Sequence, residues 1–225
     1  MKKLLILCVL IFYNIYIYIY FFFLRLDIIA IPDFEPVAME NWGLITIRES
    51  FLMYDPKETP TEIQEYIAVI MAHELAHQWF GNLVTMKWWN DLWLNEGAAT
   101  FFEYKGVNHI FPEWGMMDLF ILHKTQRALE LDALANSHPV SVFVENPIEI
   151  ESIFDTVSYY KGASVLYMLE IVLCACAFQS GLNDYLNMHA YGNTETSDLW
   201  EVLTKHSKNS SVSTELDVKV SAISM

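Results

Sequence analysis

The sequence predicts an α+β fold that is mostly helical, with a small β portion at its N-terminal side. Two short segments rich in β-branched residues, Asp27–Ile31 and Leu44–Arg48, read as strands. From residue 60 onward, helical patterns with start and stop signals predominate. There is no internal repeat and no obvious linker among the 225 residues. We therefore expect one domain, over residues 25–206.

The first long helix is expected from Pro60 to about Phe80, after a loop over residues 55–60. Thr59 would be its N-cap, Pro60 would occupy the first helical position, and Glu62 would close a capping box. Gly81 and the residue after it are a stop signal. Further helices are expected at Asp91–Tyr104, Glu113–Leu134, Ser158–Leu173, Leu182–His189 and Ser197–Lys205.

The two ends of the chain differ in composition from the middle. Residues 1–24 form an apolar leader, and residues 4–24 are long enough to span a bilayer as a helix. Lys2 and Lys3 precede the apolar run, which favours a retained signal-anchor with the rest of the chain extracellular or lumenal. The alternating Ile-Tyr repeat and the Phe run favour a second interpretation, an artefact of the gene model. Residues 207–225 are Ser-rich and predict a flexible tail.

Charge and cysteine content exclude some functions. The net charge is −15 and no basic cluster is present, so a nucleic-acid partner is excluded. Cys174 and Cys176 lie in an apolar run, where core thiols are more common than metal ligands. Neither the redox compartment nor the oligomeric state follows from the sequence.

One motif predicts a metal site. His73 and His77 are four residues apart on the first long helix, which places both imidazoles on one face. Glu96 follows after eighteen further residues and is spaced to supply a third ligand from a second helix. Three protein ligands with one open position are the pattern of catalytic zinc. Glu74, between the histidines, would take a proton from the activated water.

Three blocks of sequence resemble the zinc aminopeptidases of the aminopeptidase N family, gluzincins with a thermolysin-like catalytic domain. The first block is VAMENWG, Val37–Gly43. The second is HELAHQWFGN, His73–Asn82, with WLNEG at Trp93–Gly97. The third is SYYKGA, Ser158–Ala163. Three ordered blocks with compatible spacing make a chance match very improbable.

The resemblance implies a function and further site residues. The chain would be a metalloaminopeptidase that binds one Zn²⁺ and removes the N-terminal residue from peptides. Tyr159 would donate to the oxyanion, and its neighbour Tyr160 would only pack. Glu40 would bind the free α-ammonium group of the substrate. The family block around Glu40 implies further substrate-binding residues, which are Ala38, Met39 and Asn41.

Some features lie outside the family pattern or on its margin. Val37 replaces the usual first glycine of its block, which would restrict the backbone there. Asn95 and Thr100 are candidates to support the metal ligands, whereas Glu103, seven residues after Glu96, is left out of the predicted site. Family members carry domains before and after the catalytic one. The alternative is therefore an inactive or weakly active fragment that still binds zinc.

Overall fold

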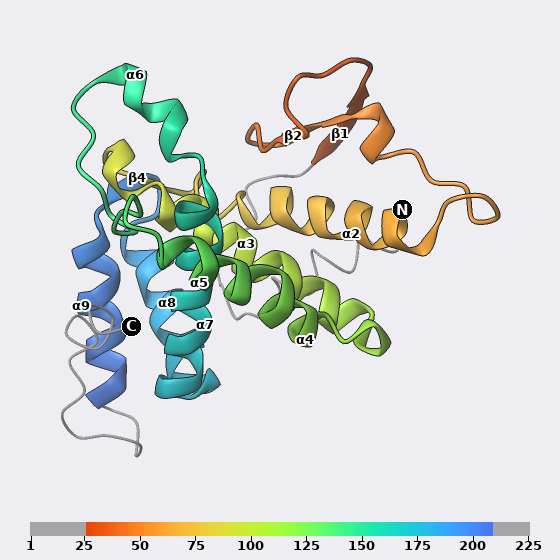
Figure 1. The fold of residues 1–225 in the computed structure, drawn as a ribbon. Coiled ribbons are helices and arrows are strands. Elements are labelled where there is room, and N and C mark those ends of the chain that lie inside the picture. Colours follow the sequence, from red (N-terminus) through yellow and green to blue (C-terminus); the bar gives the residue numbers. More distant parts are fainter. Residues whose placement is uncertain (1–25, 209–225) are drawn as a thin grey trace.

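The computed structural model describes residues 26–208 and has the predicted α+β, mostly helical architecture (Figure 1). The strands are β1 (Asp27–Ile31), β2 (Ala38–Met39), β3 (Leu44–Arg48), β4 (Val84–Met86) and β5 (Gly192–Thr194). The helices are α2 (Thr61–Ala76), α3 (Trp93–Ile110), α4 (Met116–Phe120), α5 (Gln126–Asp132), α6 (Pro147–Ile150), α7 (Gly162–Leu173), α8 (Ala175–Met188) and α9 (Thr196–Lys208). The predicted leader, residues 1–24, lies outside the described residues.

Shorter turns connect these elements. Single 3₁₀ turns occur at Glu49–Phe51, Trp89–Asp91, Pro112–Trp114 and Glu151–Ile153. Two π-helical turns, Ile121–Thr125 and Val157–Lys161, are inserted before α5 and α7. Turns of this kind are rare and often mark functional sites.

The small sheet at the N-terminal side has the order β1-β3-β2. β1 is parallel to β3, with Asp27 opposite Leu44, and β2 is antiparallel to β3, with Ala38 opposite Ile47. β2 therefore lies at an edge of the sheet, and the sheet lies beside α2 in Figure 1. Ile45 and Ile47 of β3 are fully buried and anchor the sheet in the hydrophobic core.

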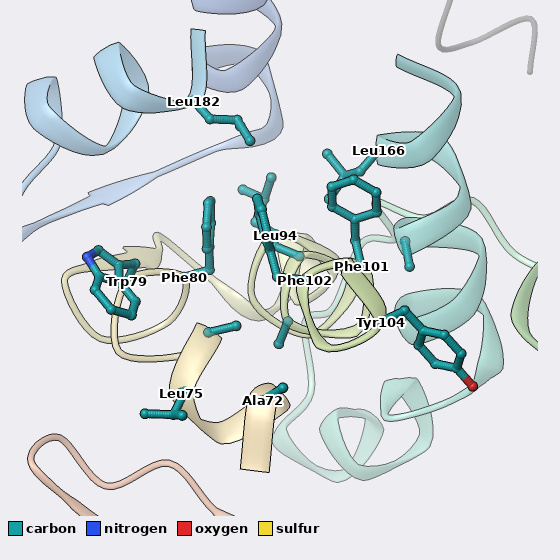
Figure 2. Close-up of a cluster of buried hydrophobic side chains, with 14 of the residues drawn as sticks. Ala72, Leu75, Trp79, Phe80, Leu94, Phe101, Phe102, Tyr104, Leu166 and Leu182 are labelled. Carbon is teal, nitrogen blue, oxygen red and sulfur yellow. The ribbon is translucent and has the colours of Figure 1, made fainter. Parts of the chain in front are cut away.

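α3 is the central helix of the fold. Its residues from Trp93 to Tyr104 are all buried, and it packs against α2, α4 and α7. Figure 2 shows Phe101 and Phe102 of α3 between Leu75 of α2 and Leu166 of α7. A helix buried on all sides is normally apolar throughout. The polar residues buried on α3 therefore point to a function, and they are Asn95, Glu96, Thr100 and Glu103.

Two glycines allow α3 and α7 to touch backbone to backbone. A Cβ on Gly97 would lie 3.0 Å from the Gly162 Cα, tighter than most real Cβ contacts. A Cβ on Gly162 would lie 3.2 Å from the Trp93 Cβ. The contact brings the start of α3 close to the π-helical turn that precedes α7.

The predicted bounds of the first long helix are wrong at both ends. The predicted capping box does not form, because Pro60 is the N-cap, has extended backbone and makes no side-chain cap. At the other end α2 stops at Ala76 rather than Phe80. The carbonyls of His77 and the two residues after it accept from amides five residues further on, instead of the four that an α-helix requires, so the α-helix ends there.

The tail and the cysteines also differ from expectation. α9 runs to Lys208, so the first two residues of the predicted tail are helical, and residues 209–225 lie outside the described part. Cys174 is half-buried and Cys176 is exposed, so the latter is not a core residue. Within residues 26–208, no helix is both long and apolar enough to cross a membrane.

Candidate metal centre and active site

A cavity of about 620 Å³ opens between the sheet edge, α2 and α3. All the predicted site residues but one line it, namely Ala38, Met39, Glu40, His73, Glu74, His77, Glu96 and Tyr159. The exception is Asn41, which is exposed and donates from its side chain to the Thr46 hydroxyl at 3.3 Å. Asn41 sits in the tight turn between β2 and β3, where its carbonyl accepts from the Leu44 amide.

The three predicted metal ligands converge on one point. His73 Nε2 and His77 Nε2 are 3.0 Å apart. Glu96 Oε2 lies 3.4 Å from His73 Nε2 and 3.2 Å from His77 Nε2. Ligand atoms bound to a tetrahedral zinc lie about 3.4 Å from each other. The spacing of these three atoms therefore fits a zinc ion.

The protonation pattern of the histidines also fits a metal. His77 Nδ1 is 2.8 Å from the Phe80 carbonyl, and His73 Nδ1 is 2.5 Å from Glu103 Oε2. Both partners are acceptors, so each Nδ1 acts as a donor, and each Nε2 is left to face the common point. Glu96 Oε2 is buried and accepts no aligned hydrogen bond, so it too is available to a cation.

Glu103 takes the supporting role that Asn95 and Thr100 were candidates for. Asn95 instead accepts from the Met86 amide at 3.4 Å, which ties β4 to α3. Burial alone would raise the pKa of Glu103, but the nearby Lys124 charge and the His73 hydrogen bond hold it below its ordinary value. Glu103 lies seven residues, two helical turns, after Glu96. That spacing was the signal that it shares the face of the third ligand.

Burial and charge shift the other ionisable groups of the site. Burial would lower the pKa of His73, but hydrogen bonds to Glu103 and Glu96 raise it well above its ordinary value. Burial would raise the pKa of Glu96, but the His77 charge and the close approach of both histidine rings lower it. The negative charge of Glu96 therefore lies where the two Nε2 atoms meet, which is where a cation would bind.

Glu74 is a buried carboxylate that faces the same cavity. Burial raises its pKa to about 7, with the charges of His73 and His77 opposing that rise. Its Oε2 is buried without a hydrogen-bond partner among the described residues. An unpaired carboxylate oxygen in such a cavity is placed to accept a proton from water.

Tyr159 lies on the π-helical turn Val157–Lys161. Its ring is stacked on His73, with centroids 6.2 Å apart and an angle of 8° between the planes. Burial and the negative charge of the nearby Glu96 carboxylate raise its pKa far above the ordinary value, so the hydroxyl stays a donor. Asp155 precedes this turn, and its Oδ1 accepts from the Val157 amide. The other oxygen, Oδ2, lies 2.9 Å from His138 Nε2.

Tyr160 does not line the cavity. Its ring instead contacts a lysine, with Lys124 Nζ 4.2 Å from the ring centre. The structure therefore gives the two neighbouring tyrosines different surroundings.

Glu40 follows the edge strand β2 and is fixed through its backbone. Its carbonyl accepts from Asn82 at 2.8 Å and from Gln78 at 3.2 Å. Gln78 also accepts from the Gly43 amide at 3.1 Å. The side-chain amides of Gln78 and Asn82 therefore fix the segment around Glu40 beside the cavity. No role for these two amides was predicted from the sequence. Val37 has no positive φ, so it imposes no backbone strain there.

Comparisons with known proteins agree with this geometry. The peptidase family M1 domain matches residues 6–222. Glutamyl aminopeptidase of Sus scrofa is 53% identical over 183 residues, which cover 81% of this chain and 19% of that protein. Aminopeptidase M1-D of Oryza sativa subsp. japonica is 52% identical over 179 residues (80% and 20%). Aminopeptidase N of Canis lupus familiaris is 51% identical over 180 residues (79% and 18%).

The chain spans about a fifth of the length of these curated relatives. The family match, by contrast, covers nearly all of the chain and includes every ligand of the candidate metal centre. The resemblance predicted from the three sequence blocks is confirmed. This chain belongs to peptidase family M1.

Proposed function

We propose that the chain holds the catalytic centre of a zinc aminopeptidase, which hydrolyses the first peptide bond of a substrate with a free N-terminus. The observation that carries this proposal is the convergence of the His73, His77 and Glu96 ligand atoms, which all lie within 4.8 Å of one another. When bound there, zinc would supply a Lewis acid that polarises the scissile carbonyl and lowers the pKa of a bound water.

The chain's own residues divide the remaining work. Glu74, with its free buried oxygen, takes the proton of the attacking water and passes it to the leaving amine. Tyr159 donates its hydroxyl proton to the oxygen on which negative charge develops. Both side chains line the cavity, Glu74 from α2 and Tyr159 from the turn before α7. A scissile carbonyl bound in the cavity would therefore have both a base and a hydrogen-bond donor beside it.

Substrate orientation falls to the edge of the sheet. Ala38 and Met39 form a strand that borders the cavity, and an edge strand can pair with an extended peptide. Glu40 comes directly after them. Its carboxylate would form a charge-assisted hydrogen bond with an α-ammonium group and so select the first peptide bond.

The second candidate function is zinc binding without catalytic turnover by this chain alone. An open apolar cavity of about 580 Å³ lies between β1, α2 and the 3₁₀ turn Pro112–Trp114, and its lining includes Ile28, Met71 and Trp114. Apolar surface of this kind usually has a partner. The chain also spans only about a fifth of its relatives, which supports the view that further protein contributes to the complete enzyme.

The two proposals differ in one assay. The purified 225-residue chain, loaded with zinc, is given an aminoacyl p-nitroanilide and the same compound with its amine acetylated. An aminopeptidase releases nitroaniline from the free amine only, loses activity on chelation and regains it with zinc. Glu74→Gln should bind zinc without turnover. A parent chain that binds one zinc and releases nothing supports the fragment instead.

A further inference from the structure

A buried lysine lies behind the candidate metal centre. Lys124 is on the π-helical turn Ile121–Thr125, and its side chain is only 14% exposed. Its ammonium lies 3.0 Å from Glu103 Oε1, 4.2 Å from the centre of the Tyr160 ring and 5.3 Å from that of Tyr104. A lysine is rarely buried to this degree unless a partner balances its charge.

Lys124 connects two parts of the site that otherwise lie on separate elements. On one side, Glu103 Oε2 is 2.5 Å from His73 Nδ1, so the lysine reaches a metal ligand through one carboxylate. On the other side, Tyr160 is the immediate neighbour of Tyr159 on the second π-helical turn. One ammonium group thus joins α3 to both π-helical turns.

Glu103 depends on this lysine for its charge balance. Its Oε1 is buried and accepts no aligned hydrogen bond from any described residue, so the ion pair with Lys124 is what compensates that oxygen. Without the lysine, Glu103 would keep a buried carboxylate with one uncompensated oxygen. The carboxylate would then turn toward water and release His73.

Resting on the proposed function, we propose that Lys124 is a positioning residue that acts through its neighbours. Its ammonium holds Glu103 against His73 and holds the Tyr160 ring in place, so that the metal ligand and the Tyr159 hydroxyl keep one geometry. It touches neither substrate nor metal itself.

Whether removal of the Lys124 charge weakens or tightens zinc binding distinguishes a positioning role from simple charge repulsion. A lysine this close to a site for a divalent cation repels that cation. If only its charge mattered, Lys124→Met would tighten zinc binding. A positioning role predicts weaker zinc binding instead, because the loss of a contact that orients a metal-bound histidine typically lowers metal affinity.

Lys105 provides a matched control on α3. It also pairs with a glutamate, Glu170, and lies over an aromatic ring, that of Phe101, at 5.3 Å. Neither Lys105 nor Glu170 lines the cavity. Lys105→Met therefore removes the same kind of lysine contact as Lys124→Met, but away from the candidate metal centre.

The experiment is a zinc titration of the full chain against a chelator of known affinity, with Kd, kcat and KM measured for each variant. Lys124→Met should raise the zinc Kd about 10-fold, the lower end of the range for outer contacts, since it acts one contact further out. It should lower kcat with KM little changed. Lys124→Arg, which keeps the positive charge, should have the zinc Kd of the parent chain, and so should Lys105→Met.

Thermal unfolding of each variant accompanies the titration. Lys124→Gln keeps a donor for Glu103 without a charge and is titrated beside Lys124→Met, so that the test does not depend on one variant folding. Zinc binding that is unchanged or tighter in a folded Lys124→Met or Lys124→Gln chain would overturn the role of Lys124, as would an equal loss in Lys105→Met. A parent chain that binds no zinc contradicts the proposed function itself, and with it this role.

Discussion

Tyr159 and Tyr160 are adjacent in sequence, but only the first faces the candidate metal centre. Tyr159 stacks on His73 and lies close to the Glu96 carboxylate, whereas the Tyr160 ring contacts Lys124. Removing a hydroxyl from each therefore tests the assignment of roles at the level of single atoms.

Tyr159→Phe is expected to lower kcat by about 10²- to 10³-fold, the usual cost of losing one oxyanion donor. KM and the zinc Kd should change little, because the ring and the three ligands remain. Tyr160→Phe is the matched control, since it keeps the ring that Lys124 contacts and should retain activity. Steady-state kinetics of both variants decide the point, and equal losses would contradict the assignment.

Glu40→Gln is expected to lower kcat/KM by about 10- to 100-fold, because a charge-assisted hydrogen bond is worth about 1.5–3 kcal/mol. The loss should appear with free-amine substrates. Glu35→Gln removes an equivalent charge from an exposed residue outside the cavity and should have no effect. Comparable losses in the two variants would mean that only the general negative charge matters.

The residues that could be predicted are those whose partners are set by local spacing. His73, Glu74 and His77 share one helix, and Glu96 follows at a characteristic distance. Lys124 had no such signal, because its contacts with Glu103 and Tyr160 arise only when distant elements pack together. The substrate-binding role of Asn41 stays a prediction, and its side chain hydrogen-bonds to Thr46 across the turn that follows β2.

At the level of elements, the contact between α3 and α7 positions Tyr159 relative to Glu96. Gly97→Ala is expected to force these helices apart, because its Cβ would lie 3.0 Å from Gly162 backbone atoms. The free energy of unfolding should fall by about 1–3 kcal/mol, as in other overpacked sites. Loss of kcat should accompany it, since the Tyr159 hydroxyl shifts.

Gly106→Ala is the control on the same helix. Its Cβ would lie 3.8 Å from Ala72, an ordinary contact, so stability should be kept or slightly raised. Urea unfolding and kinetics of both variants check the prediction. A Gly97→Ala chain as stable and active as the parent would contradict the close approach.

The junction between α7 and α8 is strained at Cys174, which has φ 62° and ψ 151°, a conformation nearly restricted to glycine. Cys174→Gly is expected to raise the free energy of unfolding by about 1 kcal/mol, the relieved strain less the added freedom of the unfolded chain. Urea unfolding measures it. Cys176→Ala, which removes the exposed neighbouring thiol, should not stabilise to the same degree, and a less stable Cys174→Gly chain would contradict the strain.

The two β-branched strands were predictable, whereas the shortest strand and the ends of helices such as α2 and α8 were not. β1 and β3 match the predicted segments at both ends, because five alternating or apolar residues suffice to indicate a strand. β2 has only two residues and is defined by its pairing with β3 rather than by composition. The end of α2 was misplaced because bonds to residues 82–84 compete with the helix.

For the whole molecule, the family is established but the extent of the functional unit is a separate question. The chain matches about a fifth of each relative, and the open apolar cavity beside β1 is a surface on which further protein could pack. Membrane attachment through residues 4–24 stays a prediction, as does the alternative that these residues come from the gene model.

Zinc binding to the metal-free chain tests the central claim most directly. We predict one zinc per chain for the parent and for Glu74→Gln, and a large loss of affinity for His77→Ala, which removes a ligand. Bound zinc should raise the unfolding temperature, since it stabilises only the folded state. A parent chain that is folded by circular dichroism and binds no zinc in this titration would contradict the account.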